Sequence, residues 1–173
     1  FNTDGGTDVA SVTQKCGTEV VAPEAPTKTG YTFLGWDKEF PVVMGCEDAT
    51  ITALWRENEY KVTFVYQGAD GGNETVSKGV KYESAYGELP TPTKTGYTFL
   101  GWYTAVEDGE EVTSETAYKT VCAKKLYARW SVNAYTITFD TKGGTEVPSI
   151  TQDYGTEVVS PTNPTRVGYT FAG

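Results

Sequence analysis

One stretch of the chain is repeated, and this repetition constrains the fold more than any other feature. The sequence Pro-Thr-Lys-Thr-Gly-Tyr-Thr-Phe-Leu-Gly-Trp occupies residues 26–36 and recurs unchanged over residues 92–102. A third version, with substitutions, occupies residues 164–173. A spacing of about 70 residues is too long for one turn of a solenoid and is typical of a small domain. The sequence therefore predicts a tandem array of small domains.

The similarity between the copies extends beyond this stretch. Residues 1–35 align with residues 139–173 with 22 identities in 35 positions. Residues 51–64 align with residues 126–139 through their apolar positions. The alignments predict three repeats: residues 1–57, which lack the start of a first strand; residues 58–132, which form a complete repeat; and residues 133–173, which stop before the last strands. We expect the third repeat to need a neighbouring chain, or its own continuation, to complete its sheet.

Alternation with a period of two predicts that each repeat is mainly β. Tyr135, Ile137 and Phe139 alternate with polar residues, as expected of a half-buried strand. Glycine pairs, which supply the positive φ of tight hairpin turns, predict turns at Asp4-Gly5-Gly6, Asp70-Gly71-Gly72 and Lys142-Gly143-Gly144. A Pro-rich crossover follows each hairpin, and residues 114–121 are a helix candidate. Polar joints as short as residues 56–58 and 131–133 leave neighbouring repeats little freedom.

Large side chains are predicted to fill the cores, because a domain of about 70 residues buries little surface. Strict alternation places Tyr97, Phe99 and Gly101 on one face of the repeated stretch. Leu100 and Trp102 then lie on the other face, and the sequence leaves open which face is core. The predicted core residues are Tyr31, Phe33, Trp36, Trp55, Tyr97, Phe99, Trp102, Leu126, Trp130, Ile137 and Phe139.

Cysteine usage allows two interpretations. The chain has three Cys, too few for a disulfide framework. Cys16 occupies the place of Tyr86 and Tyr154 in the other repeats, which suggests a core-facing position. A Cys16–Cys46 disulfide would form in an oxidising compartment and leave Cys122 unpaired. Alternatively, the three are small buried thiols.

Charge and residue types exclude several function classes. The formal net charge is −9 and the chain has no His, which argues against nucleic acid or an anionic membrane as partner and against imidazole-dependent catalysis or zinc binding. No run of 18 apolar residues is present, so no membrane insertion is expected. The carboxylates lie in turns, where Asp is common for backbone reasons. We therefore predict no enzyme activity, no cofactor and no metal site.

The ordered motifs resemble a known family. Thr-Phe-Asp at residues 138–140, the Gly-Gly turn, Tyr-Gly at 154–155, Pro-Thr before Gly-Tyr-Thr-Phe at 168–171, and Leu-Tyr-Ala-Arg-Trp at 126–130 are similar to the bacterial Listeria-Bacteroides repeat, also called the internalin B-type repeat. The resemblance covers the whole chain. It implies β-grasp-like (α+β) small domains strung in tandem on secreted or wall-attached bacterial proteins. It carries no catalytic residues.

The resemblance implies a structural role at the cell surface. The expected function is that of a stalk, spacer or filament building block in an extracellular protein, with neighbouring repeats, and identical chains in a fibre, as partners. The alternative is an adhesin-type module that binds cell-wall or host glycan through many weak sites, with Trp36, Trp102, Tyr31 and Tyr97 as stacking candidates. Recurrence of these rings in each repeat favours core duty over sugar contact. Asn73 begins a glycosylation sequon.

Overall fold

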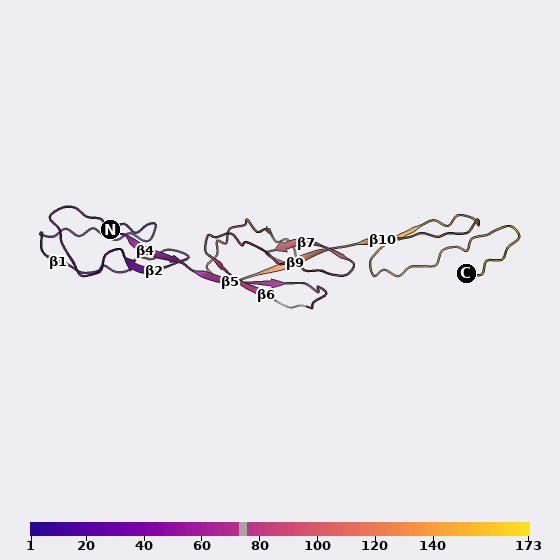
Figure 1. Cartoon of the computed structure of the whole chain (residues 1–173), viewed down its shortest axis with the longest axis horizontal. Helices are drawn as coiled ribbons and strands as arrows, with labels where there is room; N and C mark the ends of the chain where they lie inside the picture. Colours follow the sequence, from indigo (N-terminus) through magenta and orange to yellow (C-terminus); the bar gives the residue numbers. More distant parts are fainter. Residues whose placement is uncertain (73–75) are drawn as a thin grey trace. The chain divides into compact units, whose positions relative to one another are not determined.

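The structure is a computed structural model that describes residues 1–72 and 76–173. Over these residues the chain forms strands, turns and extended loops without any helix, so the fold is mainly β (Figure 1). The sequon at Asn73 lies outside the described residues. The chain forms two compact units: Phe1–Phe64, Val76–Leu89 and Thr113–Lys125 in the first, and Val65–Thr75, Pro90–Val112 and Leu126–Gly173 in the second. The first unit therefore contains repeat 1 and part of repeat 2, and the second contains the rest of repeat 2 and repeat 3.

The first unit contains three antiparallel strand pairs. They are β2 (Tyr31–Trp36) with β4 (Ala53–Glu57), β1 (Glu19–Val20) with β3 (Val42–Val43), and β5 (Glu59–Val65) with β6 (Val76–Lys81). The register of the last pair runs from Glu59 opposite Lys81 to Phe64 opposite Val76. Val62 and Phe64 project from β5 into the core and are fully buried.

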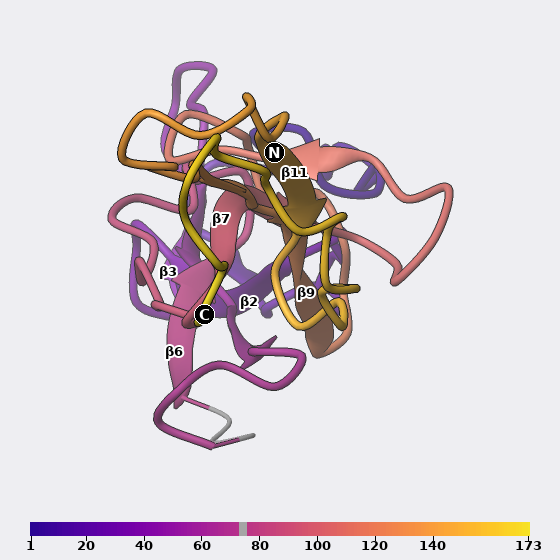
Figure 2. The same ribbon diagram turned by 90° about the vertical axis from the view of Figure 1, so that its right-hand side faces the viewer.

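In the second unit, β7 (Tyr97–Tyr103) lies between β8 (Glu111–Val112) and β9 (Lys124–Val132) and is antiparallel to both. A separate pair is formed by β10 (Ala134–Ile137), labelled in Figure 1, and β11 (Ile150–Asp153), labelled in Figure 2. After Asp153 the chain continues through turns and extended segments to Gly173.

A β-bulge changes the faces predicted for the repeated stretch. The register between β7 and β9 shifts between Phe99, which faces Trp130, and Gly101, which faces Arg129. The extra residue, Leu100, is 50% exposed. An inserted residue reverses the parity of the residues after it, so Trp102 joins Phe99 on the core side, with ring centroids 5.6 Å apart. The predicted separation of Phe99 and Trp102 onto opposite faces is therefore wrong.

The first repeat contains the same bulge. The register between β2 and β4 shifts between Phe33 and Gly35, and the Phe33 and Trp36 rings lie 5.4 Å apart. Gly35 and Gly101 have φ of 127° and 137°, a region that favours glycine. The Leu-Gly-Trp ending shared by the first two copies of the stretch thus supplies the glycine of the bulge.

Tight turns form at all three predicted positions, where the amides of Gly6, Gly72 and Gly144 donate to the carbonyls three residues earlier, but only two of the turns share one backbone geometry. Asp4 and Gly5 have φ of 48° and 83°, and Lys142 and Gly143 have 53° and 87°. Two consecutive positive φ values are the signature of a type I′ turn. In the second repeat this geometry falls on Gln67 and Gly68, with φ of 55° and 79°. The turn predicted at residues 70–72 is therefore not the counterpart of the other two.

The helix predicted for residues 114–121 does not form. Ala117 makes an isolated antiparallel bridge with Ala85, and the Tyr118 amide donates to the carbonyl of Ser84 instead of one four residues earlier. The reason is tertiary: the Tyr118 side chain is 1% exposed and its ring packs edge-on against Tyr86, with centroids 5.4 Å apart. Burial of that ring fixes the segment in an extended form.

Candidate functional site: the joints between repeats

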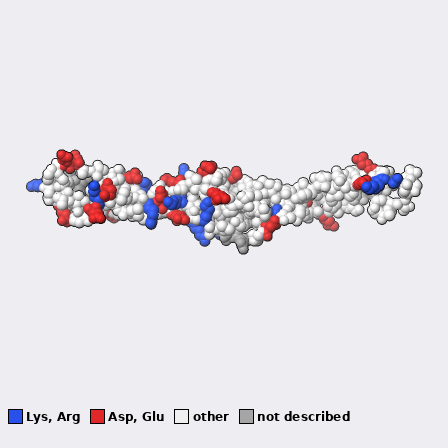
Figure 3. Space-filling model, in the orientation of Figure 1, with Lys and Arg blue, Asp and Glu red and all other residues white. Residues whose placement is uncertain are grey.

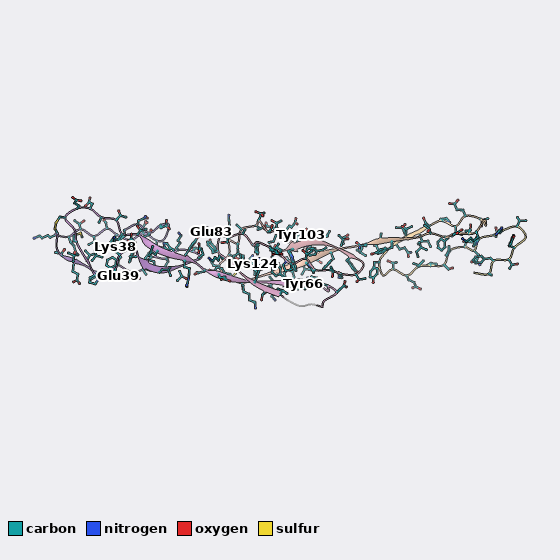
Figure 4. The ribbon with its side chains drawn as sticks, viewed as in Figure 1. Lys38, Glu39, Tyr66, Glu83, Tyr103 and Lys124 are labelled. Carbon is teal, nitrogen blue, oxygen red and sulfur yellow. A yellow bond between two sulfur atoms is a disulfide. The ribbon has the colours of Figure 1, made fainter. Side chains whose placement is uncertain are left out.

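A tryptophan and a lysine hold the type I′ turn of each closed repeat. The indole N–H of Trp55 donates to the Thr3 carbonyl at 2.9 Å, and that of Trp130 donates to the Tyr66 carbonyl at 3.0 Å (Tyr66 is labelled in Figure 4). In the first repeat the Lys28 ammonium donates to the Asp4 carbonyl at 2.7 Å. These bonds tie the last strand of a repeat to its first turn.

The same lysine covers a tyrosine of the repeated stretch. The Lys28 ammonium lies 4.5 Å from the Tyr31 ring centroid, and Lys94, which bonds the Gln67 carbonyl, lies 4.3 Å from that of Tyr97. A cation over an aromatic face is attracted by the ring quadrupole. The tyrosine so oriented is also the residue on which the next repeat begins to pack.

A single asparagine connects the last strand of each repeat, its closing strand (β4 or β9), to the first strand of the next repeat. Asn58 lies between β4 and β5; its amide donates to the Gly30 carbonyl at 2.8 Å, and its carbonyl accepts from the Tyr82 amide at 2.9 Å. Asn133 lies between β9 and β10 and repeats both bonds, to Gly96 at 2.9 Å and from Tyr154 at 2.8 Å. The backbone hydrogen bonding therefore passes without a break from one repeat to the next.

The asparagine side chain adds a third bond at each joint. The Thr98 hydroxyl donates to Asn133 Oδ1 at 2.6 Å, and the Thr32 hydroxyl donates to Asn58 Oδ1. An alanine could not supply this acceptor. The same side-chain acceptor therefore serves both joints.

A tyrosine of the following repeat covers a glycine of the preceding one. Gly30 and Gly96 are buried and have φ of 80° and 79°. A Cβ on Gly30 would lie 2.2 Å from the Tyr82 ring, and one on Gly96 would lie 2.1 Å from the Tyr154 ring. Both the backbone angle and the ring contact therefore require glycine at these positions.

The first joint also contains a phenol–carboxylate hydrogen bond. The Tyr31 hydroxyl donates to Glu83 Oε2 at 2.8 Å (Glu83 is labelled in Figure 4), and the Tyr31 and Tyr82 rings pack edge to face. This hydrogen bond to Glu83 raises the pKa of Tyr31 above its ordinary value of 10.0. Next to it, burial raises the pKa of Tyr86 and of Tyr118. These phenols therefore remain neutral at physiological pH.

The predicted core residues divide into three groups. Trp102 and Leu126 are 2% and 0% exposed. A second group is half-buried: Tyr31, Phe33, Trp36, Trp55, Tyr97, Phe99 and Trp130. The Phe and Trp rings of this group pack around Phe33 and Phe99, whereas Tyr31 and Tyr97 pack on Tyr82 and Tyr154. Ile137 is 41% exposed and Phe139 is half-buried. The expectation for Ile137 is not met.

Cys16 and Cys46 form a disulfide with their Cα atoms 4.9 Å apart, and Cys122 is a free, exposed thiol. The interpretation of three buried thiols is therefore wrong. Cys16 is exposed rather than core-facing, and so is Tyr154. The counterpart of Tyr154 in the second repeat is Tyr82, which makes the same bond to the joint asparagine, and not Tyr86 as the sequence alignment suggests.

Sequence reasoning missed the joint residues as a functional group. Asn58 and Asn133 occupy equivalent positions of the repeat, and the Gly-Tyr-Thr at 30–32 recurs at 96–98. The sequence signal available was that the same polar residues recur at both joints: Asn58 and Asn133 on one side, and Thr32 and Thr98 on the other. The tyrosines could not be found in this way, because four residues, 83–86, separate Tyr82 from the Gly87 that aligns with Gly155.

The joint contacts connect each repeat to the next. No group of three or more His, Cys, Asp or Glu that could hold a metal ion occurs among the described residues. A membrane-crossing helix is likewise not found in the part of the chain that the structure describes. On the face shown in Figure 3, acidic and basic side chains are interspersed. The fold and its joints thus define a tandem array of small β repeats whose contacts link each repeat to the next.

Comparison with known proteins identifies the repeat. The sequence pattern of the Listeria-Bacteroides repeat domain matches residues 1–40, 60–129 and 135–173. The chain belongs to this family.

Three similar proteins illustrate its context. Two from Evansella cellulosilytica are named provisionally as a membrane protein and a Gly-rich membrane protein; they are 31% and 30% identical over the whole chain, which covers 27% and 20% of their lengths. Internalin H of Listeria monocytogenes is 34% identical over 77% of this chain and 25% of its own length. The chain thus spans about a fifth to a quarter of the length of these relatives.

Proposed function

We propose that this chain is a structural segment of an extracellular bacterial cell-surface protein and acts as a stalk or spacer. The observation that carries the proposal is the joint, which is built twice with the same residue types and bonds. Each joint combines two backbone bonds, a Thr–Asn bond and a tyrosine ring seated on a buried glycine. Such a joint limits bending in a way that a flexible linker does not.

The names of related proteins support a location at the cell surface. The Evansella relatives are named as membrane proteins and the Listeria relative as an internalin. A disulfide between Cys16 and Cys46 is also typical of an oxidising compartment. An internal repeat that makes no catalytic contact suits a role in distance and orientation, with the binding functions carried elsewhere.

The rigidity of the first joint tests the proposal. In a Cys122→Ser background, spin labels at Val21 and Val121, which are 70% and 54% exposed, would report the distance between repeats 1 and 2. We expect one narrow distance distribution. Insertion of Gly-Ser-Gly-Ser between Glu57 and Asn58 should broaden it, whereas the same insertion between Glu107 and Asp108, in a surface turn, should not. A wild-type distribution as broad as that of the joint insertion would contradict the stalk function.

Glycan binding by avidity is the competing proposal. Trp102, one of the rings considered for sugar stacking, is 2% exposed, and Trp36 packs against Phe1 and Phe33. These contacts leave little aromatic face for a sugar. A glycan array probed with the full chain would decide, because specific binding that survives in a single repeat would favour an adhesin over a spacer.

A further inference from the structure

The disulfide of the first repeat closes a loop, residues 16–46, at a defined place in the backbone pairing. The Gly17 amide donates to the Met44 carbonyl at 2.9 Å, and the Met44 amide donates to the Thr18 carbonyl at 2.8 Å. These bonds continue the pairing of β1 with β3. The Cys16–Cys46 bridge follows directly after them, at the outer end of the loop.

The second repeat closes the equivalent loop with the same backbone pattern. The Gly87 amide donates to the Ser114 carbonyl at 2.9 Å, and the Tyr86 amide donates to the Thr116 carbonyl at 2.9 Å. The first of these bonds matches the bond from Gly17 to Met44, so the two loops can be aligned residue by residue. The resulting counterparts are Gly17 and Gly87, Met44 and Ser114, Cys16 and Tyr86, and Cys46 and Thr116.

Buried rings hold the loop of the second repeat closed. Tyr86 is 6% exposed and Tyr118 is 1% exposed, and their ring centroids lie 5.4 Å apart. The Tyr60 ring stacks on Tyr118 at 5.8 Å. Large aromatic side chains supply much of the core energy of a small domain. This loop is therefore fastened by packing.

The corresponding part of the first repeat lies in solvent. Residues 11–19 and 45–50 are exposed, and they include both cysteines. Asp48, the counterpart of Tyr118, is exposed as well. Val20, at the inner end of the loop, is 6% exposed. The disulfide thus takes the place of the ring pair, and it restricts the opened chain across a separation of 30 residues.

The bridge is accessible to a reducing thiol. Cys16 and Cys46 both line an open cavity of about 270 Å³. Exchange begins when the thiolate of a dithiol attacks one bridge sulfur; the S–S bond breaks, and the released cysteine sulfur takes a proton. The second thiol of the reductant then attacks the mixed disulfide and releases the other cysteine. Two electrons and two protons pass to the cysteines, and the dithiol becomes a disulfide.

We propose that the Cys16–Cys46 bridge is a redox switch of the first repeat, opened by a dithiol reductant such as the active-site cysteine pair of a thiol–disulfide oxidoreductase. Reduction releases residues 11–19 and 45–50, which the bridge holds together. The joint at Asn58 and the loop of the second repeat stay closed, because hydrogen bonds and buried rings hold them. The inference does not depend on the stalk function.

Hydrogen exchange of single amides, measured by NMR on the chain of residues 1–173 with Cys122→Ser, tests the proposal. In the oxidised chain the Gly17 and Met44 amides should exchange slowly. Dithiothreitol should accelerate their exchange at least about tenfold, because local opening now exposes them. Exchange at Gly87 and Asn58 should change by less than about twofold. Removal of the reductant and reoxidation should restore the slow exchange.

A variant without the bridge is the matched control. In Cys16→Ser, Cys46→Ser, made in the same background, Gly17 and Met44 should exchange rapidly from the start, and dithiothreitol should change nothing. Alkylation and mass spectrometry would count the thiols in each sample. A bridge that resists the reductant, or slow exchange at Gly17 and Met44 once both thiols are free, would overturn the proposal. Equal acceleration at Asn58 would also overturn it, because the bridge would then stabilise the whole repeat.

Discussion

The second and third repeats share their motifs but differ in burial. In the second, Trp102 and Leu126 are almost completely buried; in the third, Val147, at 9% exposure, is the one buried hydrophobic side chain among the described residues. Yet both contain the type I′ turn and a cation over the repeated tyrosine. Local hydrogen bonds form these motifs without the closing strand, whereas a core requires apolar surface from a strand distant in sequence.

Trp102→Ala should produce the largest effect. Truncation of a fully buried tryptophan costs about 3 to 5 kcal/mol of unfolding free energy, because transferred area is lost and a cavity remains. Phe171→Ala in the third repeat should cost less than about 1 kcal/mol, since nearly half of that side chain is exposed. Urea unfolding followed by hydrogen exchange would compare the two repeats. Similar losses would mean that the third repeat is closed in solution.

Gly96→Ala and Gly168→Ala form a matched pair. Both glycines have φ of 79°, so each alanine pays about 1 to 2 kcal/mol for the left-handed conformation. An added Cβ at Gly96 meets the Tyr154 ring at 2.1 Å, while at Gly168 nothing lies within 4 Å. Gly96→Ala should therefore cost about 1 to 3 kcal/mol more. Equal melting temperatures for the two variants would contradict the assignment of Tyr154 to the joint.

Asn133→Ala should have a smaller effect. It removes the bond from the Thr98 hydroxyl and leaves the backbone bonds of the joint in place. The expected loss is about 1 kcal/mol, measured by chemical unfolding. Asn163→Ala, at an exposed position of the third repeat, is the control. A Thr98→Val, Asn133→Ala double variant should lose little more than either single variant, because both remove the same bond.

The smallest effect should be a pH dependence confined to the first joint. The folded pKa of Tyr31 is raised, so the contribution of its bond to Glu83 is complete below pH 10.0 and is lost as pH rises through the folded value. At the first joint Glu83 follows Tyr82, whereas at the second joint the residue after Tyr154 is Gly155, which has no carboxylate. Phenolate absorbance should show Tyr31 among the late-titrating tyrosines, together with Tyr86 and Tyr118; Tyr31→Phe should remove its contribution and Glu83→Gln should shift it to lower pH. An unchanged titration curve in Tyr31→Phe would contradict the assignment.

Much of the fold could be predicted from the sequence because the repeats can be aligned with one another. The alternation in residues 135–139 predicts a strand, and β10 covers its first part. The turns at Asp4-Gly5 and Lys142-Gly143 follow from local φ preferences. The type I′ turn of the second repeat could not be placed, since both Gln67-Gly68 and the turn at residues 70–72 are plausible locally, and the hydrogen bond from Trp130 to Tyr66 identifies Gln67-Gly68 as the counterpart.

The candidate site was predictable only in outline. The sequence shows that residues 56–58 and 131–133 are too short for a flexible linker. It does not show that Tyr82 and Tyr154 are equivalent, because the spacing to the following glycine differs by four residues between the repeats. That equivalence follows from hydrogen bonds to the joint asparagines.

The sequence by itself determined the repeat, the strands and the residue types of the core, because these depend on periodicity and local backbone preference. Tertiary structure decided which faces those residues occupy and how repeats connect. The bulge at Leu100 brings Phe99 and Trp102 to one side, and Gly96 is covered by a ring from 58 residues further along the chain, Tyr154. Both outcomes depend on strand register and long-range packing, which short-range patterns do not specify.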